Sequence, residues 1–476
     1  MLQKRRGEDR FEGVSGDMRR KVILLTALLA GALLSGCGQA AAQTPAQTAE
    51  TEEKELVNEL NNELETETDL KSAVQDNTAE PEETEKGTQA QEPVPEQKDD
   101  GVRWQDFVAD MGMGWNLGNT FDAIDCSGLS DELDYEGAWL PGSTKTTKEM
   151  ISLVKEQGFR TIRIPVSWHN HVDITTDENG RQVYTISEAW MGRVREVVDY
   201  CYDEGLYVVI NIHHDDNKDK RFIYPTAECQ EQSINYITQI WTQVATEFAD
   251  YDLHLIFEVV NEVRLSGTDD EWTPDTLNSQ EAQRIINTYS QAGVDAIRAV
   301  DSGYNASRFI MCTGYAGSLY SYKNQVLPTD KGGYPNRIMV STHPYSPYFF
   351  CMDVSENSKS VFDEQVQNDV KEVFRVINQQ WTSKDVPVVI SEWGTILKAD
   401  NEESRKEHAS YYVNQAVTAC KDSAGETVQI PCILWDNGSV ADVTKGETFG
   451  YLDRQNVTWF DQGYVDAIID ACNGED

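Results

Sequence analysis

The chain has 476 residues, a formal net charge of −41 and nine cysteines. This length allows about three domains of average size, although single barrel domains also reach it. Nucleic-acid-binding proteins carry basic patches, so a chain this acidic argues against nucleic acid and favours a neutral or cationic partner.

The N-terminus has the pattern of an export signal. A basic cluster at residues 19–21 precedes an apolar run at 22–34, which ends in Ser35-Gly36-Cys37. The run is shorter than the roughly 20 apolar residues that span a bilayer. The segment 1–37 resembles a bacterial lipoprotein signal with Cys37 as the lipidated first residue, and an ordinary secretory signal is the alternative. Met18, next to the basic cluster, is an alternative start to Met1.

Residues 38–100 differ in composition from the rest. They hold 18 acidic residues, four basic residues and no aromatic residue. Such a segment buries too little apolar surface to offset the entropy of ordering it. We expect a disordered acidic linker that holds the remainder of the chain away from the outer face of the cell membrane.

Eight cysteines remain when Cys37 is set aside, at positions 126, 201, 229, 312, 351, 420, 432 and 472. They form no CxxC motif, and no histidines lie at zinc-ligand spacing, so we expect no structural metal. Export permits disulfides, and buried free thiols are the alternative. Cys201, Cys312, Cys420 and Cys432 fall inside helix or strand patterns, which favours thiols there.

From residue 101 onward, apolar strands alternate with amphipathic segments. The expected strands are 113–119, 161–168, 207–214, 254–262, 308–315, 338–345, 386–394 and 429–437. The expected helices are 145–157, 187–204, 228–249, 280–300, 361–380, 402–420 and 464–472. Eight nearly continuous apolar strands separated by helices predict an α/β (β/α)8 TIM barrel over 101–476. The fifth repeat is the weakest, with loop-like Gly and Pro between 314 and 335.

Each expected strand ends in polar or aromatic residues that could take part in chemistry. They are Asn119, Arg163 with Trp168, His213 and His214, Asn261 and Glu262, Tyr315, His343 with Tyr345, Glu392 with Trp393, and Trp435 to Asn437. In such barrels the active site lies at the C-terminal ends of the strands. Eight strand ends that meet at one rim are stronger evidence than any one residue.

Two of these residues, Glu262 and Glu392, are carboxylates at the ends of apolar strands. A buried carboxylate is costly unless it has partners or a function. Glycoside hydrolysis needs two carboxylates, one that protonates the leaving oxygen and one that attacks the sugar or activates water. Tryptophan rings offer flat surfaces for sugar rings. The set therefore indicates a glycosidase.

The same motifs resemble those of glycoside hydrolase family 5, in particular its bacterial endoglucanases. The matching stretches are Gly114-Trp-Asn-Leu-Gly-Asn-Thr120, Ile162-Arg-Ile-Pro-Val-Ser-Trp168, Ile210-Asn-Ile-His-His214, Asn261-Glu262, His343-Pro344-Tyr345, Ser391-Glu392-Trp393-Gly394 and Leu434-Trp-Asp-Asn437. Arg264 to Thr268 and Phe449 to Asp453 make the group with broad β-glucan and xyloglucan specificity look closest.

The resemblance implies a role for each matching residue. Glu262 would be the acid/base and Glu392 the nucleophile of a retaining mechanism, with Glu262 protonated and Glu392 ionised beside Arg163. Tyr345 would bond the nucleophile, and His343 would orient Glu262. The residues implied to contact sugar are Asn261, His213, His214 and Trp435, with Asn119 and Asp122 on the outer glucose-binding side.

One departure from the family pattern is Val263, which stands where a proline usually follows the acid/base. The expected function is endo-hydrolysis of β-1,4-glucans by a monomer without a cofactor. No dinucleotide, P-loop or HExxH motif occurs. Xyloglucanase, lichenase, xylanase or mannanase activity, or a catalytically silent glycan-binding surface protein, are the alternatives.

Overall fold

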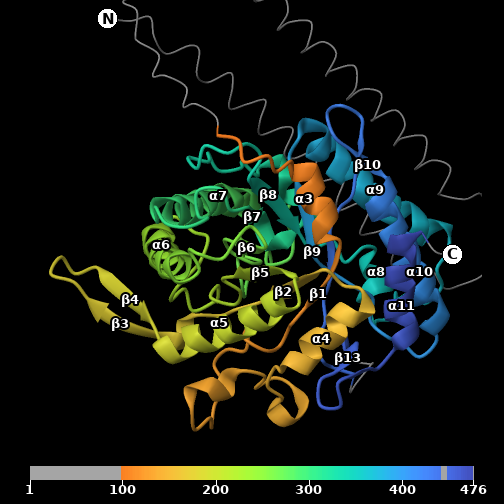
Figure 1. Ribbon diagram of the computed structural model, residues 1–476, viewed down its shortest axis with the longest axis horizontal. Coiled ribbons are helices and arrows are strands. Elements are labelled where there is room, and N and C mark those ends of the chain that lie inside the picture. The colour runs from red at the N-terminus through yellow and green to blue at the C-terminus, as the bar shows by residue number, and fades with distance from the viewer. Residues whose placement is uncertain (1–97, 441–446, 475–476) are drawn as a thin grey trace, which may run out of the picture. The chain divides into compact units, whose positions relative to one another are not determined.

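A computed structural model describes residues 98–440 and 447–474 (Figure 1). Eight parallel strands close into a barrel in the order β1-β12-β9-β8-β7-β6-β5-β2. They are β1 (Met113–Asn116), β2 (Thr161–Ile164), β5 (Tyr207–Asn211), β6 (Leu255–Glu258), β7 (Ile310–Thr313), β8 (Ile338–Thr342), β9 (Val388–Trp393) and β12 (Cys432–Leu434). All eight lie inside the predicted ranges, and the predicted barrel is confirmed.

The barrel strands are buried on both faces. Nearly every residue of these strands is buried, because the lumen side chains fill the barrel and the outer ones pack under helices. The pairing of neighbouring strands sets the heights of their residues: Asn211 of β5 pairs with Glu258 of β6, and Arg163 of β2 pairs with Val209 of β5. Polar residues late in these strands therefore lie at similar heights near one end of the lumen.

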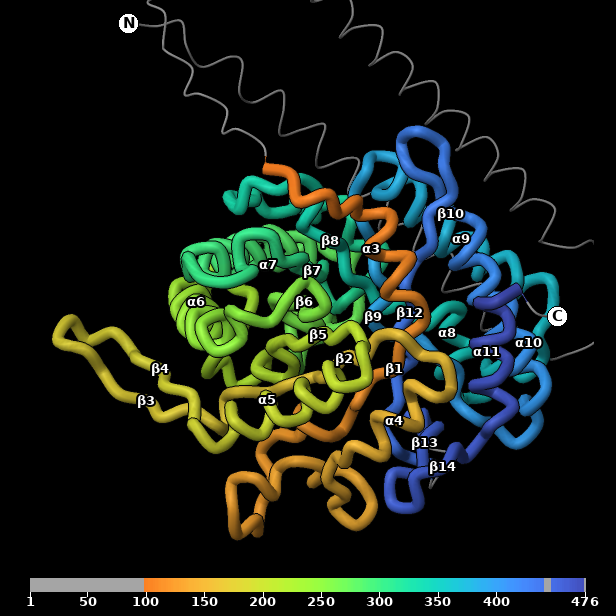
Figure 2. Tube along the Cα trace, in the orientation of Figure 1, coloured from red at the N-terminus to blue at the C-terminus, as the bar shows by residue number. Residues whose placement is uncertain are grey.

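Helices surround the barrel, as the tube view shows (Figure 2). They are α4 (Lys148–Gln157), α5 (Glu188–Asp203), α6 (Gln230–Glu247), α7 (Leu277–Ala299), α9 (Glu364–Gln380), α10 (Glu402–Thr418) and α11 (Gln462–Asn473). Side-chain N-caps fix several starts, since Thr147, Ser187, Thr276 and Asp363 each accept a hydrogen bond from a backbone N–H in the first turn.

The sequence patterns missed several short elements. Helix α3 (Trp104–Met111) precedes β1, and its Phe107 stacks on Phe309 and packs edge-on against Tyr207, at the N-terminal ends of β7 and β5. Strands β3 (Val172–Thr176) and β4 (Gln182–Ile186) form a hairpin that projects from the barrel beside α6 (Figures 1 and 2). Other short elements include α8 (Tyr348–Cys351) and the two-residue strand pairs β10–β11 (Cys420–Lys421, Thr427–Val428) and β13–β14 (Leu452–Asp453, Thr458–Trp459).

The fifth repeat lacks a helix of the usual length. Between β7 and β8 the described chain forms two short 3₁₀ helices, η4 (Tyr315–Gly317) and η5 (Leu319–Lys323). This agrees with the weak helical pattern of that stretch.

The folded unit begins slightly before residue 101. The Lys98 N–H donates to the Gly333 carbonyl at 2.8 Å, and Arg337 donates to Asp100 at 2.5 Å. The predicted signal region, 1–37 with Cys37, and almost all of the predicted linker, 38–100, lie outside the described residues. In the part of the chain that is described, no helix has the length and apolarity to cross a membrane.

The eight cysteines of the barrel are all free thiols. Six are buried, and Cys126 and Cys472 are partly exposed. Of the two alternatives that the sequence left open, disulfides or free thiols, the described residues show free thiols. The core is therefore held together without cross-links.

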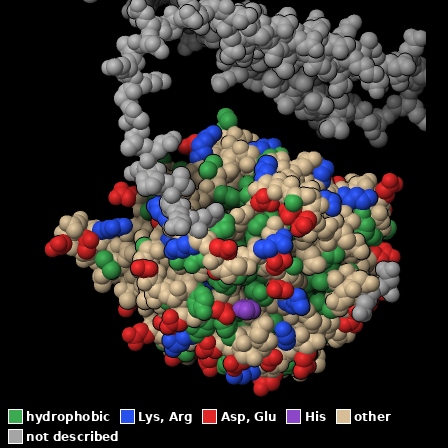
Figure 3. Space-filling model, turned by 45° about the horizontal axis from the view of Figure 1, so that its top comes forward, with side chains coloured by type: hydrophobic (Ala, Val, Ile, Leu, Met, Phe, Trp, Pro, Cys, Tyr) green, Lys and Arg blue, Asp and Glu red, His purple; other side chains and the backbone are tan. Residues whose placement is uncertain are grey.

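On the face in Figure 3, acidic and basic side chains are interspersed. Lysine and arginine form no continuous basic patch there.

Candidate active site

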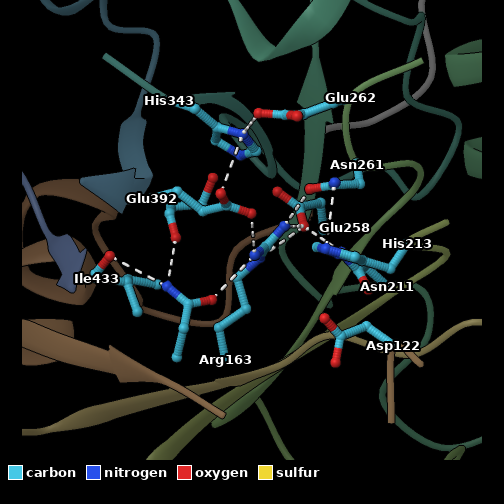
Figure 4. Close-up of polar contacts among 12 residues, drawn as sticks. Asp122, Arg163, Asn211, His213, Glu258, Asn261, Glu262, His343, Glu392 and Ile433 are labelled. Carbon is cyan, nitrogen blue, oxygen red and sulfur yellow. Dashed lines mark hydrogen bonds and ion pairs between the residues drawn. The ribbon is translucent and has the colours of Figure 1, made fainter. Parts of the chain in front are cut away.

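The two candidate carboxylates meet at the C-terminal rim of the barrel (Figure 4). Glu392 is in β9, and Glu262 lies four residues past the end of β6. A carboxylate oxygen of each and a ring nitrogen of His343 all lie within 4.8 Å of one another. The two glutamates, 130 positions apart in the sequence, are therefore brought into one site by the closure of the barrel.

Arg163 is fully buried beneath these carboxylates. Its Nη1 donates to Glu392 at 2.8 Å and to the Asn116 side chain at 2.9 Å. Its Nη2 donates to Asn261 at 2.6 Å. The contact expected between Arg163 and Glu392 is thus present.

The remaining Arg163 contacts go to a residue that the sequence analysis missed. Glu258, the last residue of β6, has its Oε2 at 2.8 Å from Nε and 2.6 Å from Nη2 of Arg163. Asn211 and Ser341 also donate to this carboxylate, at 2.8 and 2.5 Å. The sequence does contain a sign of this residue, because Glu258 is a glutamate inside an apolar strand, and a charge buried there must be paired.

His343 and Tyr345, both after β8, contact the two candidate carboxylates. The His343 Nδ1 lies 2.6 Å from Glu262 and 3.7 Å from Glu392. The Tyr345 hydroxyl donates to Glu392 Oε2 at 2.9 Å. Both contacts match the expected arrangement, in which each carboxylate has its own partner.

The pKa directions differ from the expected division of protons. Burial raises the pKa of Glu262, but the hydrogen bond and charge of His343 outweigh it, so this pKa lies below its ordinary value. Burial also raises the pKa of Glu392, and His343 and Arg163 offset that only in part. Arg163 is bonded by Glu258 as well as by Glu392. The proton on Glu262 in the free site stays a prediction, and His343, whose pKa the two carboxylates raise, is a second group that can hold it.

His213 is held between two side-chain amides. The Asn211 side-chain oxygen accepts from the Val166 N–H, so its Nδ2 donates, to Glu258 and to His213 Nδ1 at 3.1 Å. The other ring nitrogen, Nε2, lies 3.4 Å from Asn261 Nδ2. Burial and the neighbouring His214 keep the pKa of His213 well below its ordinary value, which favours the neutral ring.

The other predicted sugar-contacting residues form a second group beside His213. Trp435 is half-buried and nearly parallel to the His213 ring, with centroids 5.9 Å apart. His214 Nε2 lies 3.9 Å from Asp122, and Asp122 accepts the backbone N–H groups of Asn119 and Thr120. Burial raises the pKa of Asp122 to about 6 and lowers that of His214 to about 4.

Two clusters in the described residues have ligand-type atoms close enough to consider a metal, Glu262–His343–Glu392 and Asp122–His213–His214. In the first, the carboxylates are already bonded by His343, Arg163 and Tyr345. In the second, each ring nitrogen of His213 faces a side-chain amide. Both clusters are thus held by hydrogen bonds within the protein.

Some residues at the predicted strand ends serve the fold rather than the site. The Tyr315 hydroxyl bonds the backbone of Leu265 and Asp270. Trp393 stacks on Tyr412 in the core. Val263 is buried, and its carbonyl accepts from Ala316 while its own N–H contacts no acceptor among the described residues. Valine in place of the usual proline therefore leaves the number of backbone hydrogen bonds at this position unchanged.

A buried pair of carboxylates at the rim of a (β/α)8 barrel is the arrangement of glycoside hydrolases. The sequence profile of the cellulase family, glycosyl hydrolase family 5, matches residues 121–440. The chain belongs to this family.

Known relatives and solved structures agree with this family assignment. Endoglucanase A of Clostridium longisporum is 40% identical over 371 residues, which are 76% of this chain and 65% of that protein. Endoglucanase B of Ruminococcus albus is 38% identical, over 75% of this chain and 78% of the relative. A family 5 lichenase from Caldicellulosiruptor sp. F32, solved with cellotetraose, is 39% identical with a TM-score of 0.70, covering 81% of this chain and all of that one. A broad specificity endoglucanase from C. longisporum has a TM-score of 0.67 at 37% identity, covering 79% of this chain and 99% of that one.

Proposed function

We propose that this chain is an endo-acting, retaining glycoside hydrolase that cleaves β-1,4-glucosidic bonds in β-glucans. The observation that carries the proposal is the closeness of Glu262 and Glu392, whose nearest oxygens lie within 4.8 Å. Retaining enzymes hold their two carboxyl groups about 5–5.5 Å apart, whereas inverting enzymes need about 6.5–9.5 Å to admit a water.

In the proposed first step, Glu392 attacks the anomeric carbon. The bond to the leaving oxygen breaks, that oxygen takes a proton from Glu262, and a glycosyl ester of Glu392 forms. In the second step, Glu262 removes a proton from water, which attacks the same carbon and frees Glu392. The 2.6 Å contact with His343 supports this role, because the proton can move from Nδ1 to Glu262 within one hydrogen bond.

The neighbouring groups hold the pair and the sugar. Arg163 and Tyr345 orient Glu392 for attack. The Asn261 oxygen accepts from Arg163, which leaves its Nδ2, 3.4 Å from His213 Nε2, as the donor for the sugar 2-hydroxyl, and His213 contacts sugar beside it. Trp435 forms the floor at the cleavage position. His214 contacts sugar at the cleavage position beside His213, and Asn119 and Asp122 form the outer glucose-binding side.

The names of the relatives support a β-glucan as the substrate. They include endoglucanases, a lichenase with cellotetraose and enzymes of broad specificity. A xyloglucanase, xylanase or mannanase would use the same carboxylates with different loop pockets. The closed barrel leaves its main sheet no open edge, and one chain supplies both carboxylates, which supports a monomer.

We also propose that lipid on Cys37 anchors the enzyme at the outer face of the cell membrane and that the acidic segment 38–100 is a tether. The basis is the signal pattern described above. In a bacterial host, wild type should take up radiolabelled fatty acid and fractionate with membranes. The Cys37→Ala variant should do neither. Equal labelling of both proteins would refute the anchor.

The activity is tested by reducing-sugar release from carboxymethylcellulose, lichenan, xyloglucan, xylan and mannan. We expect hydrolysis of the β-glucans, with β-anomers released first in proton NMR. Glu262→Gln and Glu392→Gln should each lower kcat by about 10²–10⁴-fold or more.

Glu407→Gln, on the exposed side of α10, is the matched control and should match wild type. Absence of hydrolysis on every glycan would support the silent glycan-binding protein instead. Initial release of α-anomers would refute the retaining mechanism.

A further inference from the structure

Arg163 provides one positive charge for two buried carboxylates. Both Nε and Nη2 face the same oxygen of Glu258, at 2.8 and 2.6 Å, whereas one nitrogen, Nη1, bonds Glu392 at 2.8 Å. The side chains of Arg163 and Glu258 are both fully buried. The guanidinium is therefore engaged more closely by Glu258 than by Glu392, and the three groups together carry one excess negative charge.

Glu258 does not reach the substrate. Its oxygens are occupied by Arg163, Asn211 and Ser341, and it has no exposed surface. Figure 4 shows it beside Arg163, in contact with Asn211 and with no dashed line to Glu262 or Glu392. Glu258 can therefore act on the reaction only through its neighbours, chiefly Arg163, with Asn211 as a second link, to His213.

We infer that Glu258 is a positioning residue that fixes Arg163 and takes up most of its charge, so that Glu392 remains a reactive, weakly stabilised carboxylate. The inference rests on the proposed role of Glu392 as nucleophile. A nucleophile paired with a full, undivided guanidinium charge would be held in place but would attack less readily, because its ground state would be stabilised. Division of the charge keeps the orientation and reduces this stabilisation.

The other groups facing Glu392 do not replace this effect. Its charged or titratable neighbours are Arg163 from β2, Glu262 after β6, and His343 and Tyr345 after β8. Of these, Arg163 and His343 favour the ionised form of Glu392, Glu262 disfavours it, and the Tyr345 hydroxyl bonds it. Removal of the Glu258 charge would thus shift the balance toward ionised Glu392.

Glu258→Gln tests the inference because glutamine fits the same contacts. Its carbonyl oxygen can accept from Arg163 and Asn211 where Oε2 does now. Its amide can donate to the Ser341 hydroxyl, which can donate in turn to the adjacent Ser391 hydroxyl. The network stays satisfied while the negative charge is lost, so the variant is expected to fold.

The measurement is the pH dependence of kcat/KM on a soluble aryl β-cellobioside, whose acid limb reports the group that must be ionised in the free enzyme. With Glu258→Gln, the acid limb should move to lower pH by about one unit, and the plateau should fall roughly tenfold. An acid limb that stays in place, with a plateau within twofold of wild type, would overturn the inference and leave Glu258 a structural ion-pair partner.

Two further variants complete the test. Ser341→Ala removes one hydrogen bond from Glu258 and no charge, so its acid limb should stay at the wild-type pH. Glu258→Asp keeps the charge but draws it back from Arg163, and its limb should move in the same direction as that of the glutamine variant, by less. If Glu258→Gln does not fold, an unmoved limb in Glu258→Asp overturns the inference. Failure of the proposed function is recognised separately, as an inactive wild type or an active Glu392→Gln.

Discussion

At the scale of single residues, His343 is the group that links the two candidate carboxylates. Its Nδ1 lies 2.6 Å from Glu262 and 3.7 Å from Glu392. Burial lowers the pKa of His343, but the two carboxylates raise it above its ordinary value of 6.5. The proton needed for the leaving group therefore belongs to the His343–Glu262 pair, and the pair titrates as a unit.

We predict that His343→Gln moves the alkaline limb of kcat/KM to lower pH. In wild type, the pair keeps its proton until the pH exceeds the raised pKa of His343. Without His343, the proton rests on Glu262 alone, and a carboxylic acid loses it at lower pH even when burial raises its pKa. The measurement is a pH profile of kcat/KM on the aryl cellobioside. An alkaline limb at the wild-type pH would show that His343 holds no catalytic proton.

The sequence predicted the residues at strand ends better than those inside the lumen. Glu262 and Glu392 could be found because each lies at the end of an apolar run, and strand ends of a barrel share one rim. Glu258 could not be paired from the sequence, because β5 separates its strand from that of Arg163, and their contact crosses the lumen. The pKa directions of Glu262 and Glu392 could not be predicted either, because they depend on burial and on the contacts of His343 and Arg163 in the folded site.

At the scale of elements, the loop after β6 positions the rim near Glu262. Arg264 donates to the Glu262 carbonyl at 3.0 Å and lies 4.2 Å under the exposed ring of Trp272. The Tyr315 hydroxyl accepts from the Leu265 N–H at 3.1 Å and donates to the Asp270 carbonyl at 2.8 Å. Tyr315, in the short 3₁₀ helix that replaces the fifth helix, thus fixes the two ends of the loop.

We predict that Tyr315→Phe destabilises the protein by about 1–3 kcal/mol, because a buried N–H and a carbonyl lose their partner. The melting temperature should fall, and kcat should fall with it as the loop beside Glu262 loosens. Tyr320→Phe, at a position 45% exposed, is the matched control and should melt like wild type. Equal melting temperatures for the Tyr315 and Tyr320 variants would show that the loop does not depend on this hydroxyl.

Element prediction succeeded where periodicity was strong and failed where elements were short. The barrel strands are runs of three to six residues that are buried on both faces, a pattern that exposed segments do not imitate. Helix α3 has only eight residues, and the β3–β4 hairpin is largely exposed. Its contacts with α6 combine amide hydrogen bonds from Asn235, Gln239 and Gln243 with the packing of Tyr184 on Tyr236, and two buried residues in β4 are too short a hydrophobic pattern to detect.

At the scale of the whole molecule, the folded barrel is stabilised by a continuous core and free of disulfides in its described part. The charge cluster at its centre works against that stability. Three charges, on Arg163, Glu258 and Glu392, are buried together with only one cation among them. Burial of a charge without a full partner costs free energy.

Glu392, the proposed nucleophile, is therefore the position at which the molecule trades stability for reactivity. Because the folded state raises the pKa of Glu392, it binds this proton more tightly than the unfolded chain does, and stability falls as the pH rises past the ordinary value of 4.5. Glu392→Gln should melt at a higher temperature than wild type at pH 7, and the gap should narrow toward pH 4. Glu407→Gln, which alters an exposed charge, should show no such gap. A lower melting temperature for Glu392→Gln would contradict this account. An inactive enzyme that is more robust than the active one would also be a suitable form in which to trap and crystallise an uncleaved glucan.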